Sequence, residues 1–141
     1  MRHRVYGKHL GRDKNQRTAL FRGLIRALFL HESITTTQAK AKAIKGLVDT
    51  LINKGKDSSN ASKRVISSNL PQKEIIKKLV EEIVPRYPQR QSGFTQIVKL
   101  GTRPGDGTMM VKMTLLPADL IKPEKQKVSA VQLTKEKRVK K

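Results

Sequence analysis

The chain has 141 residues, with 31 Lys and Arg against 11 Asp and Glu, a formal net charge of +20 and a pI near 10.7. This excess of positive charge is larger than solubility requires and indicates a polyanionic partner, most simply nucleic acid. The lack of cysteine excludes disulfides, thiol nucleophiles and iron–sulfur sites, and the lack of tryptophan disfavours a basic helix lying on a membrane.

Residues 1–16 form a basic arm in which almost no apolar residue repeats, so the arm cannot bury enough surface to fold alone. We expect it to be disordered away from nucleic acid and ordered against it. Its Arg and Lys side chains can neutralise phosphates and release counterions, and its tyrosine can stack on a base. The candidate RNA-binding residues of the arm are Arg2, His3, Arg4, Tyr6, Lys8, His9, Arg12 and Lys14.

A first helix is predicted after residue 16 and ends at His31 and Glu32. Its apolar positions recur at steps of three and four residues: Leu20, Phe21, Leu24, Ile25 and Leu28. Arg17, Arg22 and Arg26 are candidate RNA contacts, and the last two stand one above the other on a single face. Shielding of the helix surface by Arg26 is the alternative interpretation.

The segment SITTT at 33–37 is β-branched and predicts a short strand, after which Thr36 or Thr37 would cap a second helix. Gly55 is expected to end that helix. Its apolar stripe consists of Ile44, Leu47, Val48, Leu51 and Ile52. Three lysines crowd its first half, where the helix dipole disfavours cations, which indicates an anionic partner. These candidate RNA contacts are Lys40, Lys42 and Lys45.

Two further helices are predicted. The weaker one follows Ser58 or Ser59 and would turn Ala61, Val65 and Ile66 inward. The stronger one ends at Pro85, because proline cannot continue a helix. Its apolar positions are Ile75, Ile76, Leu79, Val80, Ile83 and Val84.

The apolar period then changes from that of a helix to that of a strand. FTQIVKL and MMVKMTLL are strand-like, and the Gly-rich connection GTRPGDGT places Arg103, another candidate RNA contact, and Asp106 at a tip. Met109, Val111 and Met113 would line one face of the second strand together with Leu115. From Pro117 the chain has weak periodicity and a basic end, which predicts a mobile tail over 117–141.

Several of these segments carry a family resemblance. The start MRHR, the helix LFRGLIRAL, the stretch ITTTQAKAKAIKGLVDTLI and the later GFTQIVKLGTRPGD resemble, in this order, the bacterial-type large-subunit ribosomal protein family numbered seventeen. The resemblance covers residues 1 to about 116. It departs from the family pattern at Ala39, where a proline is expected, and in the long tail.

The resemblance implies an α+β fold of about four helices layered on a small mixed sheet of two to three strands, spanning residues 17–116 between the arm and the tail. It also implies a non-catalytic constituent of the large ribosomal subunit, which binds and clamps ribosomal RNA near the exit of the nascent-chain tunnel. Its partners would be large-subunit ribosomal RNA and neighbouring ribosomal proteins. We expect a cytoplasmic ribosome, with an organellar ribosome as the less favoured alternative, and no cofactor, metal, small-molecule substrate or membrane.

Two other function classes are alternatives: another architectural nucleic-acid-binding protein and a ribonuclease. Charge alone does not separate RNA from DNA, so another architectural nucleic-acid-binding protein is an alternative that only the resemblance disfavours. A ribonuclease using His3, His9 and Lys8 is the second alternative, and a Gly-containing arm orients such groups poorly. The connection GTRPGDGT lacks the Lys-Ser/Thr ending of a phosphate-binding loop.

Overall fold

The computed structural model describes residues 7–57 and 59–118. Its sheet contains β1 (Ser33–Thr37), β2 (Thr95–Thr102) and β3 (Met109–Leu115) in the order β1-β3-β2, and both pairs are antiparallel. The α+β class and the third strand from SITTT are confirmed. The expectation of a mixed sheet is wrong, because both neighbours of the central strand β3 run opposite to it.

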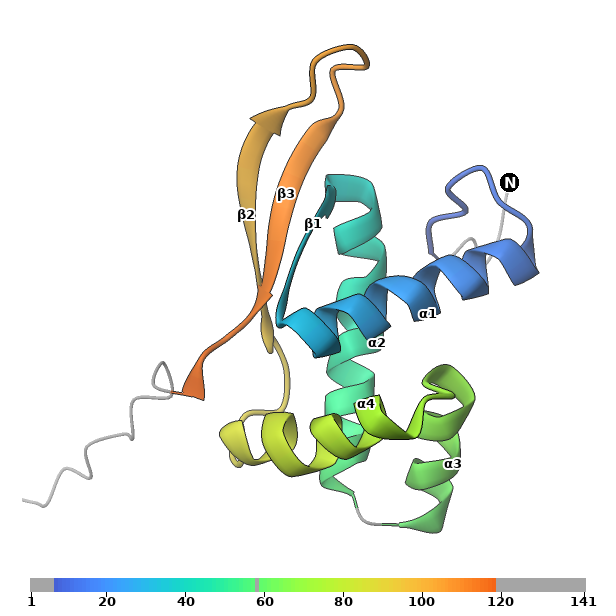
Figure 1. Cartoon of the computed structure of the whole chain (residues 1–141), viewed down its shortest axis with the longest axis vertical. Helices are drawn as coiled ribbons and strands as arrows, with labels where there is room; N and C mark the ends of the chain where they lie inside the picture. The colour runs from blue at the N-terminus through green and yellow to red at the C-terminus, as the bar shows by residue number, and fades with distance from the viewer. Residues whose placement is uncertain (1–6, 58, 119–141) are drawn as a thin grey trace, which may run out of the picture.

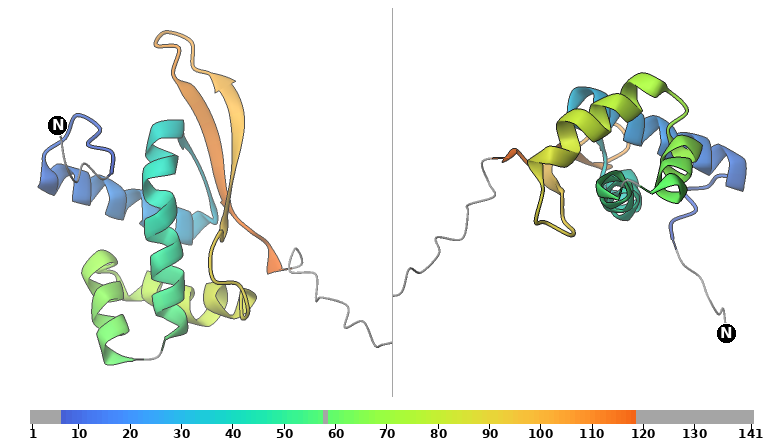
Figure 2. Two further views of the ribbon diagram at one scale, coloured as in Figure 1. Left: turned by 180° about the vertical axis from the view of Figure 1, so that it is seen from behind. Right: turned by 90° about the horizontal axis from the view of Figure 1, so that it is seen from below.

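Helix α2 (Gln38–Lys56) is the centre of the molecule. It packs against all three strands, against α1 (Lys14–His31) and against α3 (Asn60–Asn69). In Figure 1, α2 runs along the sheet and α1 crosses α2. The right-hand view of Figure 2 shows α3 and α4 (Lys73–Lys78) beside α2. Each helix therefore needs a single apolar stripe, since only one of its faces meets the core.

Helix α1 begins at Lys14, within the segment assigned to the arm, so Lys14 belongs to a helix. Its buried residues Ile25, Leu28 and Phe29 confirm the inward face, while Phe21 and Leu24 are half-buried beside it. The helix ends at Glu32, whose φ of 59° is left-handed, a conformation that usually favours glycine. The reason that a glutamate stands there is its partner: both carboxylate oxygens of Glu32 accept hydrogen bonds from Arg86, at 2.8 and 2.7 Å.

Three expectations for α2 need correction. Ile44, Val48, Leu51 and Ile52 are buried as predicted, but Leu47 is 40% exposed, because it lies on the flank of the stripe. Thr37 precedes the helix without making a side-chain capping bond.

Gly55 does not end α2, which continues to Lys56. A Cβ at Gly55 would lie 2.7 Å from Cγ2 of Val84, so this glycine allows the helix and the last helical turn before the sheet to approach closely. The signal for a helix stop was in fact a signal for close packing.

Helix α3 starts at the predicted serine: the Ser59 hydroxyl accepts a hydrogen bond from the backbone N–H of Ser62 at 3.2 Å. Asp57 reinforces this turn by accepting a bond from the Ser62 hydroxyl at 2.6 Å. Ile66 is buried as predicted, but Ala61 and Val65 are exposed. The burial of Ser62 instead of Ala61 follows from this capping network, which supplies the polar partner that a buried hydroxyl needs.

The fourth predicted helix consists of three consecutive parts: α4, a π-helical turn η1 (Leu79–Ile83) and a 3-10 turn η2 (Val84–Arg86). Helical turns thus pass through Pro85 to Arg86. The buried residues Ile75, Leu79, Ile83 and Tyr87 stand four apart, and three such steps on a pure α-helix would drift by about 120°.

The π turn adds one residue, about 100° of rotation, and so keeps this row facing the core. It also leaves Val80 44% exposed, contrary to the sequence-based assignment. The row continues into the loop that follows, where the buried Tyr87 ring lies 5.2 Å from that of Phe94 and its hydroxyl donates to the carbonyl oxygen of Leu116.

Strands β2 and β3 form a long hairpin whose connecting loop stands clear of the helices (Figure 1). Val111, Met113 and Leu115 are buried as predicted and Met109 is half-buried. A bulge at Leu100 interrupts the pairing of β2 with β3 and leaves that side chain 56% exposed. None of the described helices combines the length and the apolar character needed to cross a membrane.

Candidate nucleic-acid interface

The described part of the arm folds back onto the first helix through a tight turn. Leu10 and Gly11 at its centre have φ values of 55° and 62°, as in a type I′ turn. The turn is closed by the backbone N–H of Arg12, which donates to the His9 carbonyl oxygen at 3.2 Å, and by the Arg12 guanidinium, which donates to the Leu10 carbonyl oxygen at 2.8 Å. Arg12 is therefore partly engaged in holding the arm.

A depression of about 390 Å³ lies where the arm meets α1 and α2. Three segments distant in sequence supply basic residues to it: the arm through Lys8 and His9, α1 through Arg17, and α2 through Lys42. Its apolar floor contains Phe21 and the Leu47 that sequence analysis placed in the core. We call this site the arm depression; it gathers four of the predicted RNA-binding residues around one concave surface.

One hydrogen bond links the arm to the helix inside this depression. The Arg17 guanidinium lies 2.8 Å from Nδ1 of His9, and because a guanidinium only donates, Nδ1 must accept. An anion in the depression would compete with His9 for the Arg17 guanidinium.

The other cationic residues predicted to bind RNA lie at separate places on the surface. Lys14 is exposed at the start of α1, and Lys45 is exposed and Lys40 half-buried on α2, but none of the three lines the arm depression. Arg22 and Arg26 line a second cavity farther along α1. The sequence therefore identified cationic helix faces, and the fold distributes them over more than one surface.

Arg103 is less available to RNA than its position at the hairpin tip suggested. Its Nε lies 3.0 Å from Oδ1 of Asp106 and its Nη2 lies 2.5 Å from Oδ2, a bidentate pair within the loop. This bonding, with additional bonds from Thr108, lowers the pKa of Asp106 far below its usual range. Arg103 is held by its own loop, and any RNA contact would share it with Asp106.

Two lysines, Lys56 and Lys78, hold the fold together by donating to backbone carbonyls. The Lys56 ammonium donates to the Arg90 carbonyl oxygen and lies 4.9 Å from the centre of the Phe94 ring, and burial lowers its pKa. Lys78 donates to the Leu30 carbonyl oxygen at 2.8 Å, which ties α4 to the end of α1. Sequence patterns could not separate these lysines from RNA-binding ones, because their partners are backbone carbonyls distant along the chain.

The described residues contain no group of three or more His, Asp or Glu side chains able to hold a metal ion. His31 is exposed at the end of α1, remote in the chain from the His9–Arg17 pair. The arrangement thus provides cations and apolar surface for binding. Among the predicted arm residues, Arg2, His3, Arg4 and Tyr6 lie outside the described residues, as does the tail from residue 119.

Comparison with known proteins supplies the remaining information. Residues 20–116 match the family model of ribosomal protein L17. The chain is 47% identical over 126 residues to the large ribosomal subunit protein bL17 of Thermodesulfovibrio yellowstonii, covering 89% of this chain and 93% of that protein. It is 49% identical over 109 residues to bL17 of Hydrogenobaculum sp., covering 77% and 92% of the two chains. The bL17 protein of Pelobacter propionicus is 42% identical over 110 residues, covering 78% and 87%.

Proposed function

This chain belongs to the ribosomal protein L17 family, and we propose that it binds and clamps large-subunit ribosomal RNA between its N-terminal arm and the basic surfaces of α1 and α2. Members of this family are structural constituents of the large ribosomal subunit, and the chain is accordingly not an enzyme.

The arm depression supports this proposal because separate segments contribute charge to one concave surface. Lys8, Arg17 and Lys42 come from the arm, α1 and α2, so a phosphate backbone lying in the depression would contact all three segments at once. Contacts to phosphate fix the position of a protein on RNA without reading its sequence. Binding would also fasten the arm to the helices, because the anion offsets repulsion among the cations.

Salt-dependent binding tests the proposal. The full-length chain is titrated with protein-free large-subunit ribosomal RNA over a range of salt concentrations. Arg17→Gln and Lys42→Gln should each weaken binding and lower the slope of log K against log salt by about 0.7–0.9, the contribution of one phosphate contact. The matched control is Lys77→Gln, because Lys77 is exposed on α4 and already lies 4.0 Å from Glu81.

Unchanged slopes in both variants, with binding as tight as that of the original chain, would contradict the clamp. If Lys77→Gln lowers the salt slope as much as Arg17→Gln and Lys42→Gln do, binding depends on the total charge of the protein and not on the arm depression. Thermal unfolding of each variant provides the check on folding.

The position near the exit of the nascent-chain tunnel is a separate part of the proposal, supported by the family resemblance. Neighbouring ribosomal proteins would then be the protein partners. A cross-linking experiment tests this position. A photoreactive group is placed at Thr102, which is exposed, in subunits that carry a stalled nascent chain long enough to emerge from the tunnel. Cross-links to the nascent chain are expected, and cross-links confined to ribosomal components remote from the exit would contradict it.

A further inference from the structure

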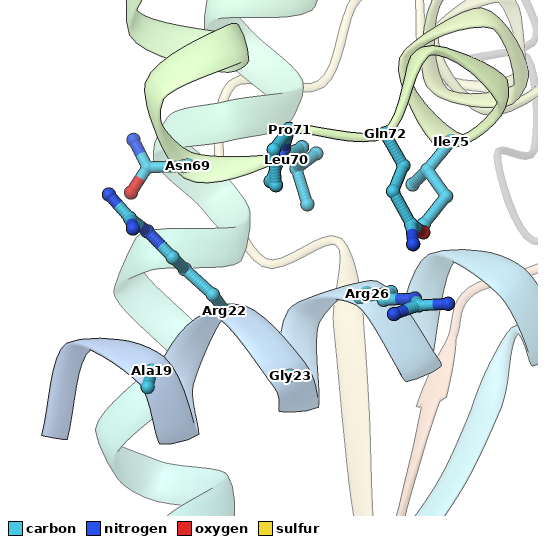
Figure 3. A pocket seen from close by; sticks show the side chains of 9 residues that line it. All are labelled: Ala19, Arg22, Gly23, Arg26, Asn69, Leu70, Pro71, Gln72 and Ile75. Atoms are coloured by element: carbon cyan, nitrogen blue, oxygen red, sulfur yellow. The ribbon is translucent and has the colours of Figure 1, made fainter. Parts of the chain in front are cut away.

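A second cavity, of about 250 Å³, separates α1 from the connection between α3 and α4. On its α1 side stand Ala19, Arg22, Gly23 and Arg26, which recur at helical spacing and so form one face. On the opposite side the chain passes from α3 through residues 69–72 into α4. Figure 3 shows the two arginines at separate points along the helix, with Arg22 extending toward Asn69 and Arg26 lying near Gln72.

The walls of this cavity combine apolar and polar chemistry. Leu70 and Ile75 are 1% and 4% exposed, so the inner end of the cavity is closed by core side chains. Gly23 contributes open space, since a Cβ placed there would meet nothing within 4 Å. The amide nitrogen of Asn69 donates to the Val65 carbonyl oxygen at 2.9 Å, which leaves its Oδ1 as an acceptor.

The charges at the cavity are not neutralised by the protein. Within residues 7–57 and 59–118, the ion pairs are Lys77–Glu81, Glu32–Arg86 and Arg103–Asp106, and neither Arg22 nor Arg26 takes part in one. Both arginines are exposed. A ligand that complements this cavity must therefore be small, partly apolar, able to hydrogen-bond with amides, and attached to negative charge.

The size and chemistry together favour one occupant. A volume of about 250 Å³ is about eight times the ~30 Å³ share of a water molecule and lies just below the ~300–1,000 Å³ of sites for drug-sized ligands. RNA-binding proteins commonly accept single bases splayed out of loops or bulges, stack them on aromatic or arginine side chains, and hydrogen-bond their edges. Arginine also binds phosphate in a bidentate manner.

We propose that this cavity, the base cavity, receives one unpaired nucleobase of large-subunit ribosomal RNA. Arg22 and Arg26 bind the phosphates flanking that nucleotide, and the amides of Asn69 and Gln72 pair with its edge. This inference rests on the proposed function, since it requires that the chain binds ribosomal RNA. It goes beyond phosphate clamping, because it gives the protein one contact that depends on whether a base is unpaired.

Chemical probing of the RNA tests the base cavity. The full-length chain is bound to protein-free large-subunit ribosomal RNA, which is probed with dimethyl sulfate and a carbodiimide for base edges and with hydroxyl radicals for the backbone. The test variant Gly23→Leu fills the cavity without altering charge. The matched control Ala61→Leu adds the same side chain on an exposed position of α3 that does not line the cavity.

The expected result is protection of one otherwise reactive base by the original chain and by Ala61→Leu. Gly23→Leu should lose that protection and bind about tenfold more weakly, with an unchanged salt slope because no phosphate contact is lost. Gln72→Ala, on the connection, should reduce the same protection and serves as a second variant if Gly23→Leu folds poorly.

Two outcomes would overturn the inference while leaving the proposed function intact. One is backbone protection by the original chain without protection of any single base. The other is protection of a base that survives in both Gly23→Leu and Gln72→Ala. Absence of all backbone protection is a different result, since it would contradict RNA binding itself and the base cavity with it.

Discussion

The ion pair between Glu32 and Arg86 should stabilise the fold measurably, and it can be tested by a double-mutant cycle. Glu32 ends α1 and Arg86 ends the helical turns before the sheet, so the pair joins segments 54 residues apart in sequence. Both guanidinium nitrogens donate to separate carboxylate oxygens, at 2.8 and 2.7 Å. The cycle consists of Glu32→Gln, Arg86→Gln and the double variant.

The magnitude follows from the geometry and the exposure. A hydrogen bond to a charged group contributes about 1.5–3 kcal/mol when buried, whereas exposed ion pairs contribute about 0.2–1 kcal/mol. The side chains of Arg86 and Glu32 are 27% and 38% exposed, so solvent screens the pair in part. We expect a coupling free energy of about 1–2 kcal/mol, with each kcal/mol lowering the melting temperature by about 4–8 °C.

The pH dependence gives an independent check on the same pair. Hydrogen bonding to Arg86 lowers the pKa of Glu32, with burial opposing and the charges of Arg86 and Lys78 assisting. A lowered folded-state pKa means that this stabilisation is present above the unfolded value of about 4.3 and is lost as the pH falls through the folded value. Thermal unfolding from pH 7 into acid should therefore show this component in the original chain and lack it in Glu32→Gln.

A glycine variant separates the ion pair from the backbone. Glu32→Gly removes the same carboxylate but also removes the strain of a φ of 59°, which for a residue with a Cβ is about 1–3 kcal/mol. It should be less destabilising than Glu32→Gln. A coupling free energy within about 0.3–0.5 kcal/mol of zero would refute the role given to the pair, because unconnected sites add within that range.

Three further outcomes are expected. Leu28→Ala should lower the free energy of unfolding by about 2–5 kcal/mol through a core cavity, whereas the exposed Leu47→Ala should lower it much less in denaturant titrations; equal losses would mean that the faces of α2 are misassigned. Gly55→Ala should destabilise by about 1–3 kcal/mol because its Cβ meets a neighbouring side chain, while Gly23→Ala should raise the melting temperature slightly. A chain ending at Ala118 should melt like the full chain and bind RNA modestly more weakly at low salt; failure to enter the subunit would make the tail a specific anchor.

The sequence by itself determined the class of partner and most of the elements. A net charge of +20 and a basic arm indicate a polyanionic partner. This conclusion does not depend on the tertiary structure, because electrostatic attraction acts at long range and grows with the number of charges. The apolar periods located the helices and strands, and the buried rows containing Ile25, Ile44 and Val111 confirm the faces. Recognition of separated family segments then indicated the ribosome, which charge alone could not separate from other nucleic-acid partners.

Only the tertiary structure decided which cations share a surface. Lys8, Arg17 and Lys42 meet in the arm depression because the arm turns back and α1 crosses α2, and no local pattern encodes such a crossing. Lys56 was indistinguishable in sequence from these lysines, yet it lies against the Phe94 ring. The same holds for the core: period alone could not predict that a π turn would rotate later positions, or that a neighbouring helix would leave Leu47 uncovered. The apolar period of a segment indicates which face of that one helix or strand is buried. A binding site depends on how several helices and strands are placed relative to one another, which the period of a single segment does not contain.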